Sequence, residues 1–297
     1  MTKFWPWVLF LAYLSYGLPS VTLYLITFII ILRNRKTFES SFFKLYIYDG
    51  LLNLLTYFNN WFKTRAAAIS DDGYFMGQFY KTVGEYPIVM MISMFLNFHM
   101  AYVQYATTTL ISLNRLSAMI NSNRYEPRWK KWMGFGILLI FLFPSLNTHV
   151  VFWYKVEMVY SNESYSMTTE MPINSVFIYC IPFMILCAGA SVVSNIFSIS
   201  LVRGLSSTKK HKADTNFMVY TCVTCIAQVF GTTLSCIRAV FVGSVVAAAC
   251  THIIPFMSDT LSLVQPWLLS VFSQQMNSKI LCRKPATASK LFTRSAI

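Results

Sequence analysis

The sequence predicts an all-α integral membrane protein, a seven-transmembrane helix bundle with its N-terminus outside and its C-terminus in the cytoplasm. Three observations predict this fold class. Hydrophobic residues make up 56% of the 297 residues and charged residues only 12%, whereas soluble domains carry about 25% charged residues. The apolar residues form seven stretches of about 20 residues or more, which is the length that a helix needs to cross a bilayer. Lysine and arginine gather in alternate connections between these stretches.

The seven predicted spans make a single transmembrane domain, 1–297, that ends in a basic cytoplasmic tail, 273–297. In chain order the spans are about 7–32, 42–61, 86–116, 132–153, 173–202, 217–237 and 253–272. The first starts behind Lys3 and is too long for the apolar part of a signal peptide, so we expect an uncleaved signal anchor. The run from Cys236 to Phe256 is nearly continuous, so the turn between the last two spans is the least clearly marked boundary.

The second, third, sixth and seventh spans each carry polar side chains on one helix face. At helical spacing, these stripes are Asp49, Asn53, Thr56 and Asn60; Asn97, Gln104, Thr108 and Arg115; Thr221, Thr224, Gln228, Thr232 and Ser235; and Asp259, Ser262, Pro266, Ser270 and Ser273. Polar groups are costly in a bilayer and usually face other helices or water. The stripes therefore predict either hydrogen bonds between helices or a partly hydrated central cavity.

The two intramembrane carboxylates, Asp49 and Asp259, lie at different depths, so we do not expect a catalytic pair. Each lies roughly 10 Å inside its span, Asp49 from the cytoplasmic end and Asp259 from the outer end. Asp49, with Asn53, forms an intramembrane polar site that pairs with Arg115 or holds a cation. Asp259 contacts a ligand or pairs with Arg238 or His252.

The positions of the basic residues decide the orientation. Eighteen of the 24 Lys and Arg residues lie in or beside the first, third and fifth connections and in the tail. Seven spans place the termini on opposite sides, so the N-terminus is expected outside. The net charge of +13 then reflects topology and contact with anionic lipid at the inner leaflet of the bilayer, and we expect no nucleic-acid partner.

Two modification sites fit this orientation. Asn162 begins the sequon Asn162-Glu163-Ser164 in the fourth connection, which is expected outside, where glycosylation occurs. Cys282 follows the seventh span in a basic juxtamembrane setting that suits palmitoylation.

Local sequence around the second and third spans resembles the nematode serpentine chemoreceptors of class gamma. The similar segments are Ser41–Leu55 (SFFKLYIYDGLLNLL), Thr109–Arg115 (TLISLNR), Tyr125-Glu126-Pro127 and Trp129-Lys130-Lys131. The resemblance implies that Arg115 plays the part of the arginine at the cytoplasmic end of the third helix in rhodopsin-like receptors. Asn114 stands where those receptors have an acid and supplies no charge.

The resemblance implies a non-enzymatic G-protein-coupled chemosensory receptor in the plasma membrane, extending to sensory cilia. A small molecule would bind in an outer-facing pocket lined by Asn97, Gln104, Gln228 and Asp259. A heterotrimeric G protein would couple at the inner face around Asn114 and Arg115. We expect no catalytic residues, metal or cofactor, because the chain lacks their motifs.

A small cation- or proton-coupled transporter or channel is the alternative function. Asp49 and Asp259 would then serve as stations for the ion. The sequence shows no internal repeat and no matching pair of broken half-helices, the features typical of many transporters.

Overall fold

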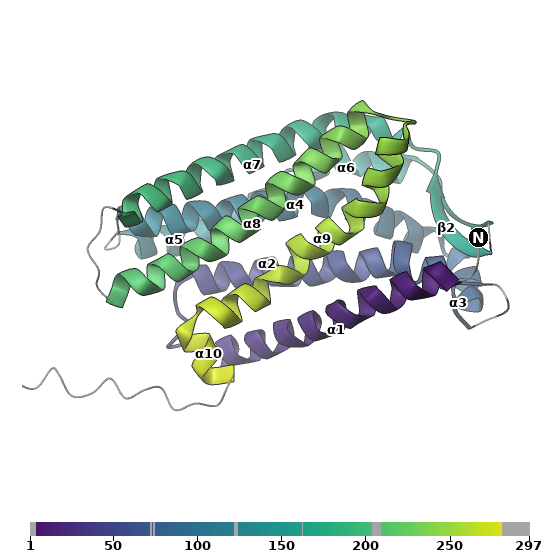
Figure 1. Cartoon of the computed structure of the whole chain (residues 1–297). Coiled ribbons are helices and arrows are strands. Elements are labelled where there is room, and N and C mark those ends of the chain that lie inside the picture. Colours follow the sequence, from purple (N-terminus) through teal and green to yellow (C-terminus); the bar gives the residue numbers. More distant parts are fainter. Residues whose placement is uncertain are drawn as a thin grey trace, which may run out of the picture.

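The computed structural model describes residues 4–71, 73, 75–121, 124–161, 163–203 and 209–280, and a bundle of long helices dominates it. The seven long helices run side by side, roughly along one direction (Figure 1). In chain order they are α1 (Phe4–Arg33), α2 (Ser41–Asn60), α4 (Pro87–Ile120), α5 (Tyr125–Leu142), α7 (Ile173–Arg203), α8 (Lys209–Val240) and α9 (Val245–Phe272). Each of the seven apolar stretches lies on one of these helices or begins on it.

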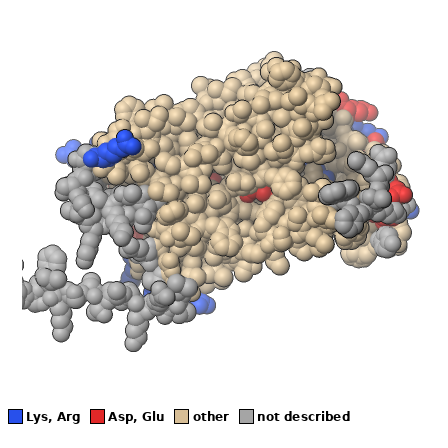
Figure 2. Space-filling view, viewed as in Figure 1, with Lys and Arg blue, Asp and Glu red and all other residues tan. Residues whose placement is uncertain are grey.

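Within the described residues, six of these helices are long and apolar enough to cross a membrane. The helix that falls short is α2, because its stripe of polar residues lowers its mean hydropathy. The surface of the bundle is apolar. No residue of α5 is buried, and its Trp132 and Phe135 side chains are exposed. Figure 2 shows a broad, mainly uncharged belt in which only a few acidic atoms are visible, with most charged side chains gathered at its two ends. The chain is therefore an all-helical multi-span membrane protein.

Two helix boundaries follow from single residues. The helix α5 ends at Leu142, and Pro144 precedes the short helix α6 (Ser145–Thr148), which a 3-10 turn, η3 (His149–Trp153), continues. Proline has no N–H to donate, so it interrupts the helical ladder here. The nearly continuous run between the last two spans is broken by a turn at 241–244, where Gly243 has φ of +80°, a conformation that side chains other than glycine rarely adopt. The Ser244 hydroxyl then caps α9 by accepting from the Ala247 N–H.

Several short elements gather at the end of the bundle where the N-terminus lies (Figure 1). They are a π-helical turn η1 (Trp61–Arg65), a 3-10 turn η2 (Ala67–Ile69), α3 (Phe75–Gly84) and an antiparallel hairpin of β1 (Val156–Ser161) and β2 (Ser164–Thr169). At the opposite end lies α10 (Gln274–Ile280). The hairpin was not predicted. Its Val156 side chain is buried in a cluster with residues of α4, and its Tyr165 side chain is buried with Ala67 of η2 and Tyr80 of α3. These contacts fix the position of the hairpin.

The central helix is α4, which packs against α2, α5, α7 and α8. The helices α1 and α2 approach closely at Gly50, where an added Cβ would lie 2.6 Å from the Phe28 ring and 2.8 Å from the Tyr24 ring. The helix α9 packs against α1, α2 and α8. This arrangement brings the polar stripes of α2, α4 and α9 together in the interior.

Candidate functional site

A buried ion pair joins the end of α2 to α9. Arg65, the last residue of η1, donates through its guanidinium to the Asp259 carboxylate, and the two side chains are 2% and 3% exposed. Tyr16 on α1 donates its hydroxyl to the other Asp259 oxygen. The Arg65 guanidinium also lies 4.5 Å from the Tyr13 ring centre and 5.1 Å from that of Tyr57. Three segments of the chain are thus tied together around one neutralised pair of charges.

The partner of Asp259 differs from the two that the sequence suggested. Arg65 takes that place, and neither Arg238 nor His252 forms an ion pair with Asp259 in the described part of the chain. The physical reason lies in η1, whose wider π-helical turn extends α2 by five residues. A residue predicted to lie in the second connection is thereby turned into the bundle and buried.

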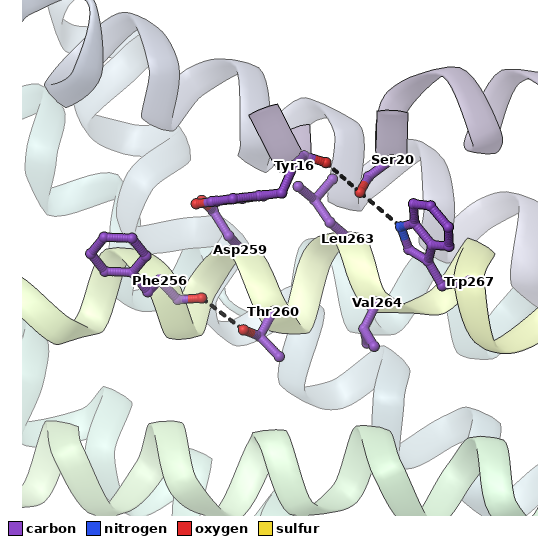
Figure 3. Close-up of a pocket in the computed structure, with 8 residues that line it drawn as sticks. All are labelled: Tyr16, Ser20, Phe256, Asp259, Thr260, Leu263, Val264 and Trp267. Atoms are coloured by element: carbon purple, nitrogen blue, oxygen red, sulfur yellow. Dashed lines mark hydrogen bonds between the residues drawn. The ribbon is translucent and has the colours of Figure 1, made fainter. Parts of the chain in front are cut away.

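Asp259 also lines a pocket of about 270 Å³ between α1 and α9. Figure 3 shows Tyr16 and Ser20 entering from α1, with the other lining residues on α9. The walls are mainly apolar, formed by Phe256, Leu263, Val264 and Trp267. Ser20 accepts a hydrogen bond of 2.9 Å from the Trp267 indole N–H and donates one of 2.7 Å to the Tyr16 carbonyl. The pocket is therefore mainly apolar, and the Asp259–Tyr16 pair forms its polar end.

A second polar network lies deeper in the bundle. Gln104 on α4 donates to the Asn53 side-chain oxygen (2.6 Å) and to the Ser262 hydroxyl (2.9 Å). Asp49 accepts from Asn53 (3.2 Å) and from Gln265 on α9. Arg115, the alternative partner from the sequence, does not hydrogen-bond to Asp49. The network joins α2, α4 and α9, as the converging stripes suggested.

Two buried oxygens in this network, Asp49 Oδ1 and Gln265 Oε1, have no hydrogen-bond partner among the described residues. Buried polar atoms are normally satisfied. A proton on Asp49 or a bound cation would satisfy the unpaired Asp49 oxygen.

The four residues expected to line a ligand pocket do not form one cluster. Asp259 lines the α1–α9 pocket. Gln104 and Gln228 are buried, and Gln228 donates a hydrogen bond of 3.0 Å to the Tyr105 carbonyl. Asn97 is half-buried on α4. In this conformation, Gln104 would reach a ligand only by exchanging hydrogen-bond partners, whereas Gln228 Oε1 is buried and has no hydrogen-bond partner among the described residues.

At the opposite end, the Arg115 guanidinium lies against two aromatic rings that also contact each other. It lies 3.7 Å from the ring centre of Phe42 on α2 and 4.6 Å from that of Phe217 on α8, and the two rings are 4.7 Å apart. Arg115 is 7% exposed. We call Arg115, Phe42 and Phe217 the arginine cage. A guanidinium over an aromatic face is attracted by the ring quadrupole, so the cage links α4 to both α2 and α8.

Beside the cage, three of the segments that resemble the class gamma chemoreceptors meet, and each contributes one residue. Asn114 donates to the Ser41 hydroxyl (3.0 Å), and Ser41 donates through its backbone N–H (2.8 Å) and its hydroxyl (3.0 Å) to the Glu126 carboxylate. Glu126 belongs to the Tyr125-Glu126-Pro127 segment. The Glu126 carboxylate of α5 is therefore linked to Asn114 of α4 by hydrogen bonds through Ser41, although Asn114 itself carries no charge.

The rim of this end is charged and exposed. Lys130 on α5 donates 2.7 Å to Glu39 between α1 and α2, and its ammonium lowers the pKa of that carboxyl. Among the described residues, no group of three or more His, Cys, Asp or Glu side chains could hold a metal. The sequence-predicted sites Asn162 and Cys282 lie outside the described residues.

Most of the chain is similar to proteins of one known family. The sequence pattern described as "Srg family chemoreceptor" matches residues 10–280. Serpentine receptor class gamma-31 of Caenorhabditis elegans is 24% identical over 281 residues, covering 89% of this chain and 88% of that protein. Serpentine receptor class gamma-53 of the same organism is 26% identical over 288 residues, covering 94% and 90%.

Proposed function

Because the chain belongs to the Srg family of chemoreceptors, we propose that it binds a small molecule in the outer half of its bundle and signals to a heterotrimeric G protein at the inner end. The family is one of receptors rather than enzymes. In this proposal α2 spans the membrane with the six more apolar helices. The N-terminus and the hairpin lie outside, and the protein resides in the plasma membrane, including that of sensory cilia.

The distribution of charge supports this orientation. The connection from α1 to α2 and the start of α5 carry Arg33, Arg35, Lys36, Arg124 and Lys131. They lie at the end of the bundle where the arginine cage is found. Basic residues are enriched in cytoplasmic connections, so this end faces the cytoplasm, where a G protein is found.

The ligand site is placed in the outer half because the chemistry available there is suited to recognition. The Asp259 pocket combines apolar walls with a polar end, as small-molecule sites usually do. Asn97, which is half-buried on α4, also lies in the outer half of the bundle. A ligand shifts the receptor between two states only if it binds them unequally. A ligand that changes the hydrogen bonds of Asp259, Gln104 or Gln228 would bind the two states with unequal affinity.

The single observation that carries the coupling proposal is the arginine cage. Arg115 lies where rhodopsin-like receptors carry their coupling arginine, and the Phe217 ring of α8 covers it. Moving the inner end of α8 outward would remove that ring and uncover the guanidinium. The aromatic contacts of the cage would then help to hold the resting state, in which Asn114 supplies no charge.

Orientation is tested with a reporter fused after Ile297 together with enzymatic deglycosylation of Asn162 in the same cells. A cytoplasmic reporter with a glycosylated Asn162 is expected. A lumenal reporter would contradict the proposal.

Coupling is tested by guanine-nucleotide exchange on a panel of Gα classes, with Arg124→Ala as the matched control for Arg115→Ala. Both variants remove an arginine near the inner end, but Arg124 is exposed and lies outside the cage. At equal surface expression, exchange is expected to fall in Arg115→Ala and to persist in Arg124→Ala. Undiminished exchange in Arg115→Ala would refute the coupling role.

A further inference from the structure

A groove of about 330 Å³ runs along α5 on the outside of the bundle, beside α4. One residue of α4 and six of α5 line it: Leu110, Arg128, Trp129, Trp132, Met133, Phe135 and Gly136. The Trp132 and Phe135 side chains are 60% and 61% exposed, and their rings meet edge to face, 6.4 Å apart. We call this feature the α4–α5 groove, and it shares no residue with the pocket beside Asp259.

The floor of the groove is held in place by the bundle. Leu110, Trp129 and Met133 are half-buried and pack against the hydrophobic core. Trp129 also donates its indole N–H to the Ser117 hydroxyl of α4 (2.6 Å). A Cβ added at Gly136 would meet no atom within 4 Å, so this residue leaves space along the helix. The groove is therefore built from fixed side chains, on a helix face that is exposed to the membrane.

Positive charge lies at one end of the groove. Arg128 lines it, and the Lys131 Nζ lies 5.5 Å from the Trp132 ring centre. Both cations are exposed. In the part of the chain that the structure describes, neither of them forms an ion pair.

Two acids at this end of the bundle do not neutralise the groove. Glu39 pairs with Lys130 at 2.7 Å, and Glu126 accepts hydrogen bonds from Ser41. The cations of the groove are therefore available to an anion from outside the chain. A hydrogen bond between such charged groups is stronger than one between neutral groups.

The chemistry of the groove changes with depth in the membrane. Arg128 lies in the first turn of α5, and Phe135 and Gly136 lie about 10–12 Å further along the helix. Trp129 and Trp132 lie between them, and tryptophan is enriched at the membrane–water interface. A cation, then indole rings, then an apolar channel match the phosphate, the glycerol region and the acyl chain of a phospholipid.

A second copy of the chain fits this surface less well. A two-fold dimer in a membrane has its axis along the membrane normal, so each residue meets the partner at its own depth. Two copies joined through the groove would therefore bring Arg128 and Lys131 toward like charges. An anionic lipid supplies the opposite charge, and in the proposed orientation this end faces the leaflet that carries anionic lipids.

We propose that the α4–α5 groove binds an anionic phospholipid of the inner leaflet. Arg128 and Lys131 bind its headgroup, and one acyl chain lies along Phe135 and Gly136. The lipid packs against α5, a helix without a buried residue, and secures it to α4. This site goes beyond the proposed receptor function, because its occupant is neither the small-molecule ligand nor the G protein.

The test is native mass spectrometry of the purified full chain, titrated with phosphatidylserine and phosphatidylcholine that carry the same acyl chains. The apparent affinity for the first bound lipid is measured for each headgroup, and phosphatidylserine is expected to bind more tightly. Arg128→Gln and Lys131→Gln should each weaken phosphatidylserine binding by about fivefold, the typical contribution of a basic residue near an anionic membrane surface. Arg124→Gln is the matched control, since Arg124 is exposed at the same end but does not line the groove. It should bind phosphatidylserine like the original chain.

A second pair of variants tests the part of the groove that holds the acyl chain. Gly134 and Gly136 both have open space where a Cβ would lie, but Gly136 lines the groove and Gly134 does not. Gly136→Leu should fill the groove and reduce phosphatidylserine binding to the level of phosphatidylcholine. Gly134→Leu should leave it unchanged. Leucine is a better helix former than glycine, so both variants are expected to keep α5 folded.

Equal affinities for the two lipids in the original chain would overturn the proposal. So would undiminished phosphatidylserine binding in Gly136→Leu, or in the double variant of Arg128→Gln with Lys131→Gln. Equal losses in the Arg124→Gln and Gly134→Leu controls would also overturn it, because binding would then not depend on the groove. A dimer that disappears in Gly136→Leu and carries no phosphatidylserine would assign the groove to a second copy of the chain instead.

Discussion

Removing one partner of the Arg65–Asp259 ion pair should destabilise the protein far more than removing both. Each single variant, Arg65→Met or Asp259→Leu, leaves a charge in a site where both side chains are at most 3% exposed. An uncompensated buried charge costs about 3–5 kcal/mol. In Arg65→Met, Tyr16 retains its hydrogen bond to Asp259, so this variant should fall at the lower end of the range.

The double variant, Arg65→Met with Asp259→Leu, removes both charges and leaves apolar side chains of similar volume. Replacing a whole buried pair in this way is often neutral. We therefore expect most of the stability to return, with a coupling energy of about 3 kcal/mol or more in the double-mutant cycle.

The assay is thermal unfolding of purified receptor in nanodiscs, followed by intrinsic tryptophan fluorescence at fixed scan rate. Lys130→Met is the control, because it removes a cation from the exposed pair with Glu39 and should leave the midpoint unchanged. Additive effects of the two single substitutions would refute the reasoning, as would single variants that unfold at the original midpoint.

Three further substitutions test the packing around the site. Tyr16→Phe removes one charge-assisted hydrogen bond to Asp259 and should cost about 1.5–3 kcal/mol, measured by the same unfolding assay. Asn53→Leu deprives buried groups on α2 and α4 of partners and should cost at least about 1–3 kcal/mol; an unchanged midpoint would contradict the network. Gly50→Ala places a Cβ 2.6 Å from an aromatic ring of α1, and overpacking of this kind costs about 1–3 kcal/mol, which should appear as a lower midpoint and lower surface expression.

The positions of the long helices could be predicted because apolar length alone determines them. The convergence of the stripes could also be predicted, since Asn53, Gln104 and Ser262 each lie on the polar face of their helix and meet in the interior. Helical spacing decides which face of its helix a residue occupies. In a bilayer, the polar faces of helices usually pack against one another.

The ion pair could not be predicted by the same means. Arg65 lies beyond the apolar part of α2, and it reaches Asp259 only because a π-helical turn carries the helix onward. A spacing rule based on 3.6 residues per turn does not anticipate that turn. The arginine cage was missed for a related reason: Phe42 and Phe217 belong to apolar runs, and nothing in their spacing indicates contact with Arg115.

The most direct test of the account is to open the arginine cage and measure guanine-nucleotide exchange without ligand. Phe217→Ala removes the α8 ring that lies 4.6 Å from the Arg115 guanidinium. In membranes with equal receptor content, we expect Phe217→Ala to raise basal exchange on at least one Gα class, and we expect the addition of Arg115→Leu to abolish the increase. Basal exchange that stays at the original level in Phe217→Ala, or that remains raised in the double variant, would contradict the account.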